Sequence, residues 1–205
     1  MARLPALVDL VSGFGCFQRI RVDQQARTLR EAGMLSPSKR GTGASEVTSR
    51  DAACLLMAVL ATDAAVWCPE AVGAYASLTT SRPRGKPRSD CDRAIFDALS
   101  RSKSPVDALE SLVTEAARDG TDLRRVRILV MRGTARMEIR MEGEDGGDGF
   151  SFSWSPAHEE ASRSRQPLAS NVMGLNGYAL TLVARLVLPP PAMDEEPGVS
   201  VPFAP

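Results

Sequence analysis

The chain has 205 residues, of which 43% are hydrophobic and 24% are charged, a balance typical of one globular domain or of two small ones that share a core. Its 25 basic and 25 acidic residues cancel, which counts against a protein that coats nucleic acid and leaves electrostatic recognition to local patches. Four cysteines without a C-x-x-C pair, and a single histidine, exclude the paired-spacing zinc patterns and indicate a reducing compartment.

The N-terminus carries a short apolar stretch that Asp9 interrupts, and no small-residue cleavage site follows, so no signal peptide is expected. The longest apolar run, from Ala52 to Ala61, is about half as long as a membrane span needs to be. We therefore expect a cytoplasmic protein that has no membrane partner.

Apolar residues recur at helical spacing through the first 120 residues. Glycines and prolines divide this part of the chain into separate segments, as they do at the ends and starts of helices. Helices are predicted over about 4–11, 22–32, 48–60, 69–76, 90–99 and 104–116.

The segment that begins at Thr48 carries the strongest helix signals. Thr48 can cap the first turn, and Asp51 stands three residues later, as in a capping box. The ten residues after Asp51 carry no charge, so this helix is predicted to be almost fully buried.

Beyond Gly120 the apolar period changes from about 3.6 residues to two. Alternation over 125–132 and again over 136–141 predicts two strands of one hairpin. Gly133 and Thr134 fit the turn between them.

Two further segments favour strands. Aromatic residues alternate with serines over 150–154, and residues 178–188 form a β-prone run that three prolines end. The sequence thus predicts an α+β protein, in which a helical N-terminal part is followed by a small antiparallel β-sheet. The predicted units are a helical domain with basic loops at 1–120, an antiparallel sheet segment at 121–190, and a Pro-rich, acidic, disordered tail at 191–205.

No constellation of residues points to an enzyme, a metal or a cofactor. The one histidine, His158, lies in a polar stretch, and no G-x-S-x-G elbow accompanies it. Residues 41–43 read GTG but lack the Gly-Lys-Ser/Thr of a phosphate loop. An acidic run could bind calcium but lacks the spacing of an EF-hand, so a solvated loop is favoured for Glu142, Glu144, Asp145 and Asp148.

The first of two basic loops covers residues 38–43, reads SKRGTG, and lies just before the helix that starts near Thr48. The amides of such a loop and of a helix N-terminus favour anions such as phosphates. Lys39, Arg40 and Thr42 are therefore candidate DNA contacts, with a surface loop that binds nothing as the alternative. The loop is far longer than the turn of a standard helix-turn-helix.

The second basic loop covers residues 81–89 and reads SRPRGKPRS. It resembles the AT-hook, a DNA-binding motif centred on Arg-Gly-Arg-Pro with a basic flank. The centre here is Arg84-Gly85-Lys86-Pro87. A lysine replaces the second arginine, and lysine is a point charge without the planar guanidinium fork.

By this resemblance, Arg84 and Lys86 would enter the narrow minor groove of A·T-rich DNA, where the negative potential is enhanced. Gly85 would let the backbone approach the groove floor because it has no Cβ atom. Arg82 and Arg88 would contact phosphates. A solvated linker between two helices is the alternative interpretation of the same residues.

Three segments of the first third of the chain also resemble small uncharacterised proteins of prophages and gene-transfer elements from GC-rich bacteria. They are residues 26–33 (ARTLREAG), 40–44 (RGTGA) and 48–53 (TSRDAA). This resemblance implies a mobile-element origin and names no activity.

The sequence therefore favours a DNA-binding accessory or regulatory protein, in which basic loops contact phosphates and the minor groove. The alternative is a protein–protein interaction module, such as a phage-encoded inhibitor or assembly factor, that binds a partner or a second copy through the sheet. An enzyme ranks last. The DNA hypothesis depends on the second basic loop being free to project its cations.

Overall fold

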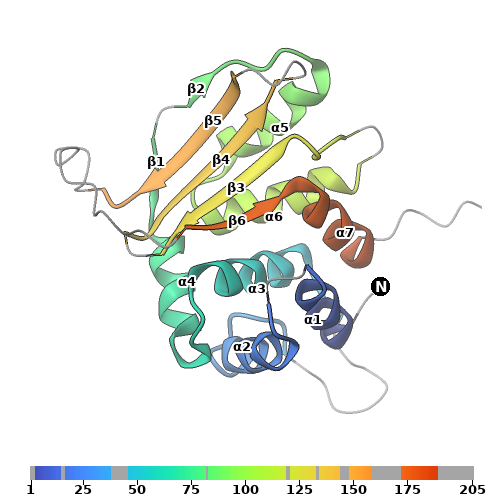
Figure 1. The fold of residues 1–205 in the computed structure, drawn as a ribbon, viewed down its shortest axis with the longest axis vertical. Coiled ribbons are helices and arrows are strands. Elements are labelled where there is room, and N and C mark those ends of the chain that lie inside the picture. Colours follow the sequence, from blue (N-terminus) through green and yellow to red (C-terminus); the bar gives the residue numbers. More distant parts are fainter. Residues whose placement is uncertain are drawn as a thin grey trace, which may run out of the picture.

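A computed structural model describes residues 3–14, 17–37, 46–81, 83–118, 121–132, 134–143, 148–157 and 172–188. Seven α-helices and one six-stranded antiparallel sheet form an α+β fold in this part of the chain, which confirms the predicted class (Figure 1). The predicted tail at 191–205 lies outside the described residues. None of the described helices combines the length and the apolar character that crossing a bilayer requires.

The first part of the chain folds into helices close to the predicted positions. Side-chain caps at Thr48, Ser89 and Ser104 start three of them. Ser89 caps α5 (Asp90–Arg101), where its hydroxyl accepts a hydrogen bond from the Asp92 amide. The helices are α1 Leu4–Ser12, α2 Arg19–Glu31, α3 Ser49–Ala61, the short 3-10 helix η1 Ala65–Trp67, α4 Cys68–Ala76, α5 Asp90–Arg101 and α6 Pro105–Ala116.

Helix α3 is the buried centre of the helical part. Every residue from Asp51 to Ala61 is buried, as the lack of charge predicts. The helix packs on α4 and α6, and Arg50 at its start pairs with Asp107 of α6 at 2.6 Å. A helix that exposes almost no side chain cannot lie in a DNA groove as a recognition helix.

The sheet has the order β1-β5-β4-β3-β6, and β2 pairs with β5 beside β1. Strands β3 (Val126–Met131) and β4 (Arg136–Glu142) form the predicted hairpin, and β5 (Asp148–Ser155) is the predicted aromatic strand. Strands β1 (Thr79–Thr80) and β2 (Arg84–Gly85) come from the helical part of the chain. Two-residue strands have no periodicity of their own, so the sequence did not predict them.

The predicted last strand over 178–188 is wrong. The strand β6 is Val172–Asn176, and Gly177–Val187 forms helix α7. The Asn176 side chain caps this helix by accepting a hydrogen bond from the Ala179 amide at 3.1 Å. The apolar run fits a buried helix as well as a strand, and the cap decides between them.

One hydrophobic core runs through both parts of the chain. Helices α5 and α6 lie behind the sheet in Figure 1, and none of the described helices covers the sheet face toward the viewer. On the covered face, Phe96 of α5 contacts Phe150 and Phe152 of β5 with ring centroids 5.2 Å apart. Trp154 beside them is fully buried. The other face of these strands is the open face.

Arg132, just after β3, ties the sheet to the helical part. Its guanidinium donates to the carbonyls of Leu60 and Val59 at the end of α3, at 2.7 and 3.0 Å. It also pairs with Asp63 at 2.8 Å. A cation at a helix C-terminus is stabilised by the helix dipole. The joint therefore fixes the position of the sheet relative to α3.

Candidate nucleic-acid interface

The hook-like segment is an edge strand of the sheet and not a free arm. Arg84 and Gly85 form β2, and their partners on β5 are Ser151 and Phe150. Just before them, the Ser81 amide donates to a carbonyl of β5 at 2.8 Å. This pairing holds the segment along β5, which corrects the expectation that it projects from the protein.

Gly85 is required by the sheet itself. Its φ angle is +78°, in the left-handed region that favours glycine. A Cβ atom at this position would lie 2.2 Å from the carbonyl oxygen of Gly149 on β5. The missing side chain therefore permits close approach to a strand of this chain, where the AT-hook resemblance implied approach to a groove floor.

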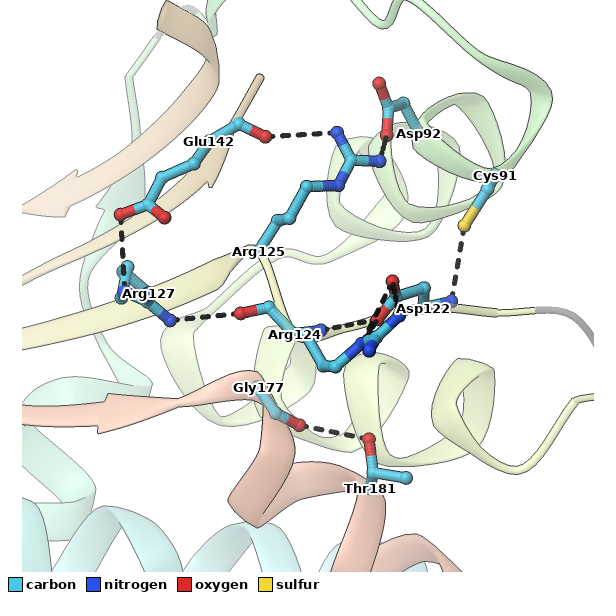
Figure 2. Close-up of polar contacts among 9 residues, drawn as sticks. All are labelled: Cys91, Asp92, Asp122, Arg124, Arg125, Arg127, Glu142, Gly177 and Thr181. Carbon is cyan, nitrogen blue, oxygen red and sulfur yellow. Dashed lines mark hydrogen bonds and ion pairs between the residues drawn. The ribbon is translucent and has the colours of Figure 1, made fainter. Parts of the chain in front are cut away.

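The far end of the segment is anchored on Asp92, a carboxylate buried in the first turn of α5. Asp92 accepts a hydrogen bond from the Arg88 amide at 3.3 Å. Its other oxygen pairs with Arg125, just before β3, at 2.7 Å, as Figure 2 shows. Arg125 in turn donates to the Glu142 carbonyl at 3.1 Å. Residues 84–88 are thus held at both ends.

The strand register aligns Arg84 with two arginines from other strands. Arg84 stands opposite Ser151, Ser151 opposite Arg140, and Arg140 opposite Arg127. Directly opposed residues of antiparallel strands point to the same face of a sheet. Phe150 and Phe152 on either side of Ser151 are buried, so this is the open face. We call Arg84, Arg140 and Arg127 the arginine row.

Two glutamates flank the arginine row and pair with its members. Glu138 lies 2.8 Å from Arg140. Figure 2 shows the second pair, in which Glu142 lies 3.2 Å from Arg127. The side chains of Arg140 and Arg127 remain 57% and 44% exposed. The Arg127–Glu142 pair is exposed on both sides and is worth little, so a ligand phosphate can compete for this guanidinium group. Glu138 is only 17% exposed and holds Arg140 more firmly, although the Arg140 side chain still faces solvent.

Of the five predicted DNA contacts in the second loop, four are described by the structure and one is not. Arg84, Gly85, Lys86 and Arg88 are all exposed. Neither Arg84 nor Lys86 has an ion-pair partner among the described residues. Arg82 lies outside the described residues.

The first basic loop leads to a helix start that already holds an anion. Lys39, Arg40 and Thr42 lie outside the described residues. The N-terminus of α3 carries a capping box of Thr48 and Asp51, and the buried Asp51 carboxylate also accepts hydrogen bonds from the amide and the hydroxyl of Ser36 at 2.7 and 2.9 Å. A phosphate bound there would lie beside this negative charge.

The other chemical candidates gain no support. His158 and residues 41–43 and 144–147 lie outside the described residues, and the described part contains no group of three or more His, Cys, Asp or Glu that could hold a metal. Burial raises the pKa of the Cys54 thiol, and it raises the pKa of the Cys68 thiol to about 11. Both thiols therefore stay protonated and unreactive at neutral pH.

Arg127, Arg140 and Asp92 were not predicted from the sequence as parts of the interface. The alternation over 125–141 already placed the two arginines on strands. The register of the hairpin, which sets Met131 opposite Arg136, then puts Arg127 opposite Arg140. The alignment of β2 with β5 depends on the tertiary fold and left no signal in the sequence.

Comparisons with known proteins add no relative. No protein-family model, no curated protein and no solved structure matches the chain. The resemblance to prophage and gene-transfer-element proteins therefore stays a prediction.

Proposed function

We propose that the protein is a DNA-binding accessory or regulatory protein whose arginine row contacts the phosphate backbone. The observation that carries this proposal is the register that aligns Arg84 with Arg140 and Arg127 on the open face. Lys86 and Arg88 extend the basic surface toward α5, and both are exposed. A mobile-element origin, which the sequence resemblance implies, is compatible with such a role.

The dimensions and the side chains suit a duplex backbone. The row crosses three strand spacings, about 14 Å at the usual distance between strands, and the major groove of DNA is about 12 Å wide. A guanidinium group binds phosphate oxygens through two parallel N–H donors. The described open face of β3, β4 and β5 presents no aromatic ring on which an unpaired base could stack.

The strand pairing favours phosphate contact over the groove insertion of an AT-hook. The minor groove is about 6 Å wide, whereas β2 has a neighbouring strand about 4.8 Å away on one side. The backbone of Arg84 and Gly85 therefore cannot lie on the groove floor while β2 stays paired. Phosphate contacts carry little sequence information, so we expect a weak preference for A·T-rich DNA.

The test is fluorescence anisotropy with labelled duplexes of random and A·T-rich sequence across a salt series. Three phosphate contacts predict that log K falls with log salt at a slope of about −2.7. The double variant Arg84→Ala/Arg140→Ala should reduce the size of this slope by about 2. The matched control is Arg101→Ala/Lys103→Ala, which removes two exposed cations outside the row. Equal loss of affinity in both double variants would show that the arginine row is not the DNA contact.

A second experiment changes the charge in the opposite direction. Glu138→Gln/Glu142→Gln removes the carboxylates that compete with phosphate for Arg140 and Arg127. We expect this variant to bind duplex DNA more tightly than the wild type. Lower or unchanged affinity would show that DNA does not contact these arginines.

A protein partner is the second candidate function, and an exposed apolar pair favours it. The side chains of Val66 and Trp67 in η1 are 66% and 61% exposed, and Ile20 on the adjacent α2 is 73% exposed. Aromatic residues of this kind are enriched at protein interfaces. The first partner to test is a second copy of the chain, by sedimentation of the wild type and Trp67→Ser. Self-association that this substitution abolishes, without change in DNA binding, would support it.

A further inference from the structure

A groove of about 370 Å³ lies between α1 and α2, away from the sheet. This volume falls in the range of small-molecule sites. Its apolar lining comprises Leu4, Pro5 and Val8 of α1 and Ala26 of α2, and its charged lining comprises Asp23, Arg27 and Arg30. The groove therefore combines a hydrophobic floor with a charged rim.

The two arginines of the rim differ in their partners. Arg27 pairs with Asp23 at 2.8 Å, one helical turn away. The side chain of Arg30 has no hydrogen bond or ion pair within the described part of the chain, and its Nε atom is buried without an acceptor. Because Nε is closed to solvent, a ligand in the groove would place its acceptor on the terminal guanidinium nitrogens of this unpaired cation.

We propose that this groove binds a small amphipathic carboxylate, with its carboxylate on Arg30 and its apolar chain on Leu4, Val8 and Ala26. A ligand with a single carboxylate is proposed because Arg30 is the one cation of the groove lining without a partner among the described residues. Arg30 lies in the last turn of α2, where the helix dipole stabilises its positive charge. The groove shares no residue with the arginine row, so this inference stands independently of DNA binding.

Titration calorimetry on the full chain tests the proposal with octanoate, octanol and acetate as probes. We expect saturable binding of octanoate, binding of octanol that is weaker by about tenfold, and no measurable binding of acetate. Arg30→Gln should weaken octanoate binding by about tenfold and leave octanol binding unchanged. The control Arg101→Gln changes the same residue type at an exposed position on α5.

Three results would overturn the proposal: no saturable binding of octanoate, equal affinities for octanoate and octanol, or unchanged octanoate binding by Arg30→Gln. The circular dichroism of Arg30→Gln should match that of the wild type, because Arg30 makes no ion pair that folding depends on. If Arg30→Gln disturbed the fold, 1 M salt would replace it as the probe, because screening should weaken octanoate binding and spare octanol. Arg84→Ala/Arg140→Ala should bind octanoate normally, which separates this site from the DNA surface.

Discussion

The two basic loops of this chain look alike in sequence and differ in their surroundings. The loop before α3 leads to a helix N-terminus where the buried carboxylate of Asp51 accepts hydrogen bonds from Ser36 and Thr48. The loop before α5 runs along β5, where Arg84 lies in line with arginines of β4 and β3. For the loop before α5, the alignment of Arg84 with cations of neighbouring strands therefore supports the proposed phosphate site more strongly than the basic run itself does.

The largest expected effect lies at the first of these regions. In the wild type, donors of Ser36 and Thr48 face the Asp51 carboxylate. Asp51→Asn replaces one carboxylate oxygen by an amide N–H₂, which is itself a donor and cannot accept these hydrogen bonds. We expect the free energy of unfolding to fall by about 3 kcal/mol, measured by urea denaturation. Asp23→Asn, at a half-exposed surface pair, should cost less than about 0.5 kcal/mol.

The same variant separates the two loops functionally. If DNA bound at the α3 N-terminus, removal of the Asp51 charge would raise DNA affinity. We expect no change in affinity under conditions where the variant is folded. A clear increase would shift the interface to the first loop.

The anchor of the second loop should give the next largest effect. Asp92→Asn weakens the pair with Arg125 and the acceptor of the Arg88 amide. We expect a loss of about 2 kcal/mol in unfolding free energy. Hydrogen exchange at the Arg88 amide should also become faster. Unchanged exchange there would show that Asp92 does not hold the loop.

A smaller effect, without any change of charge, is expected at Gly85. Gly85→Ala places a Cβ atom against Gly149 at a positive φ, so β2 should detach from β5. The loss of unfolding free energy is limited to about 1 kcal/mol because a two-residue edge strand can separate alone. DNA affinity should fall although no cation is lost. Gly73→Ala, in open space within α4, should stabilise the protein by about 0.5 kcal/mol.

The smallest expected effect concerns the C-terminal end of α3. The hydrogen bond from Arg132, together with the charges of Arg132 and Arg21, lowers the pKa of Asp63 below its ordinary value of 3.8. The stability from this group is present above that ordinary value and is lost as the pH falls through the lower native pKa. Asp63→Asn should flatten the acid limb of the stability curve by a few tenths of a kcal/mol, because Asp63 is 55% exposed.

The elements that the sequence predicted are those with long periodic patterns and local caps. The helix after Thr48 has a capping box, the hairpin after Gly120 has a long alternating pattern, and both were placed correctly. The run at 178–188 was assigned to a strand because its apolar residues fit either period, and the deciding cap, Asn176, lies outside it.

The candidate interface was predictable only in part. The resemblance to a hook marked Arg84 and its neighbours, and these residues are exposed. The alignment of Arg84 with Arg140 and Arg127 depends on the pairing of β2 with β5. These two strands are about 65 residues apart in the chain. No local pattern encodes such a pairing.

The position of β2 also bears on solubility. Together with β1 it occupies the outer edge of β5, the strand that carries Phe150, Phe152 and Trp154. An uncovered edge of that composition would template pairing with other chains, and basic residues and prolines are common protections against it. Deletion of residues 79–85 should therefore cause aggregation as well as loss of DNA binding.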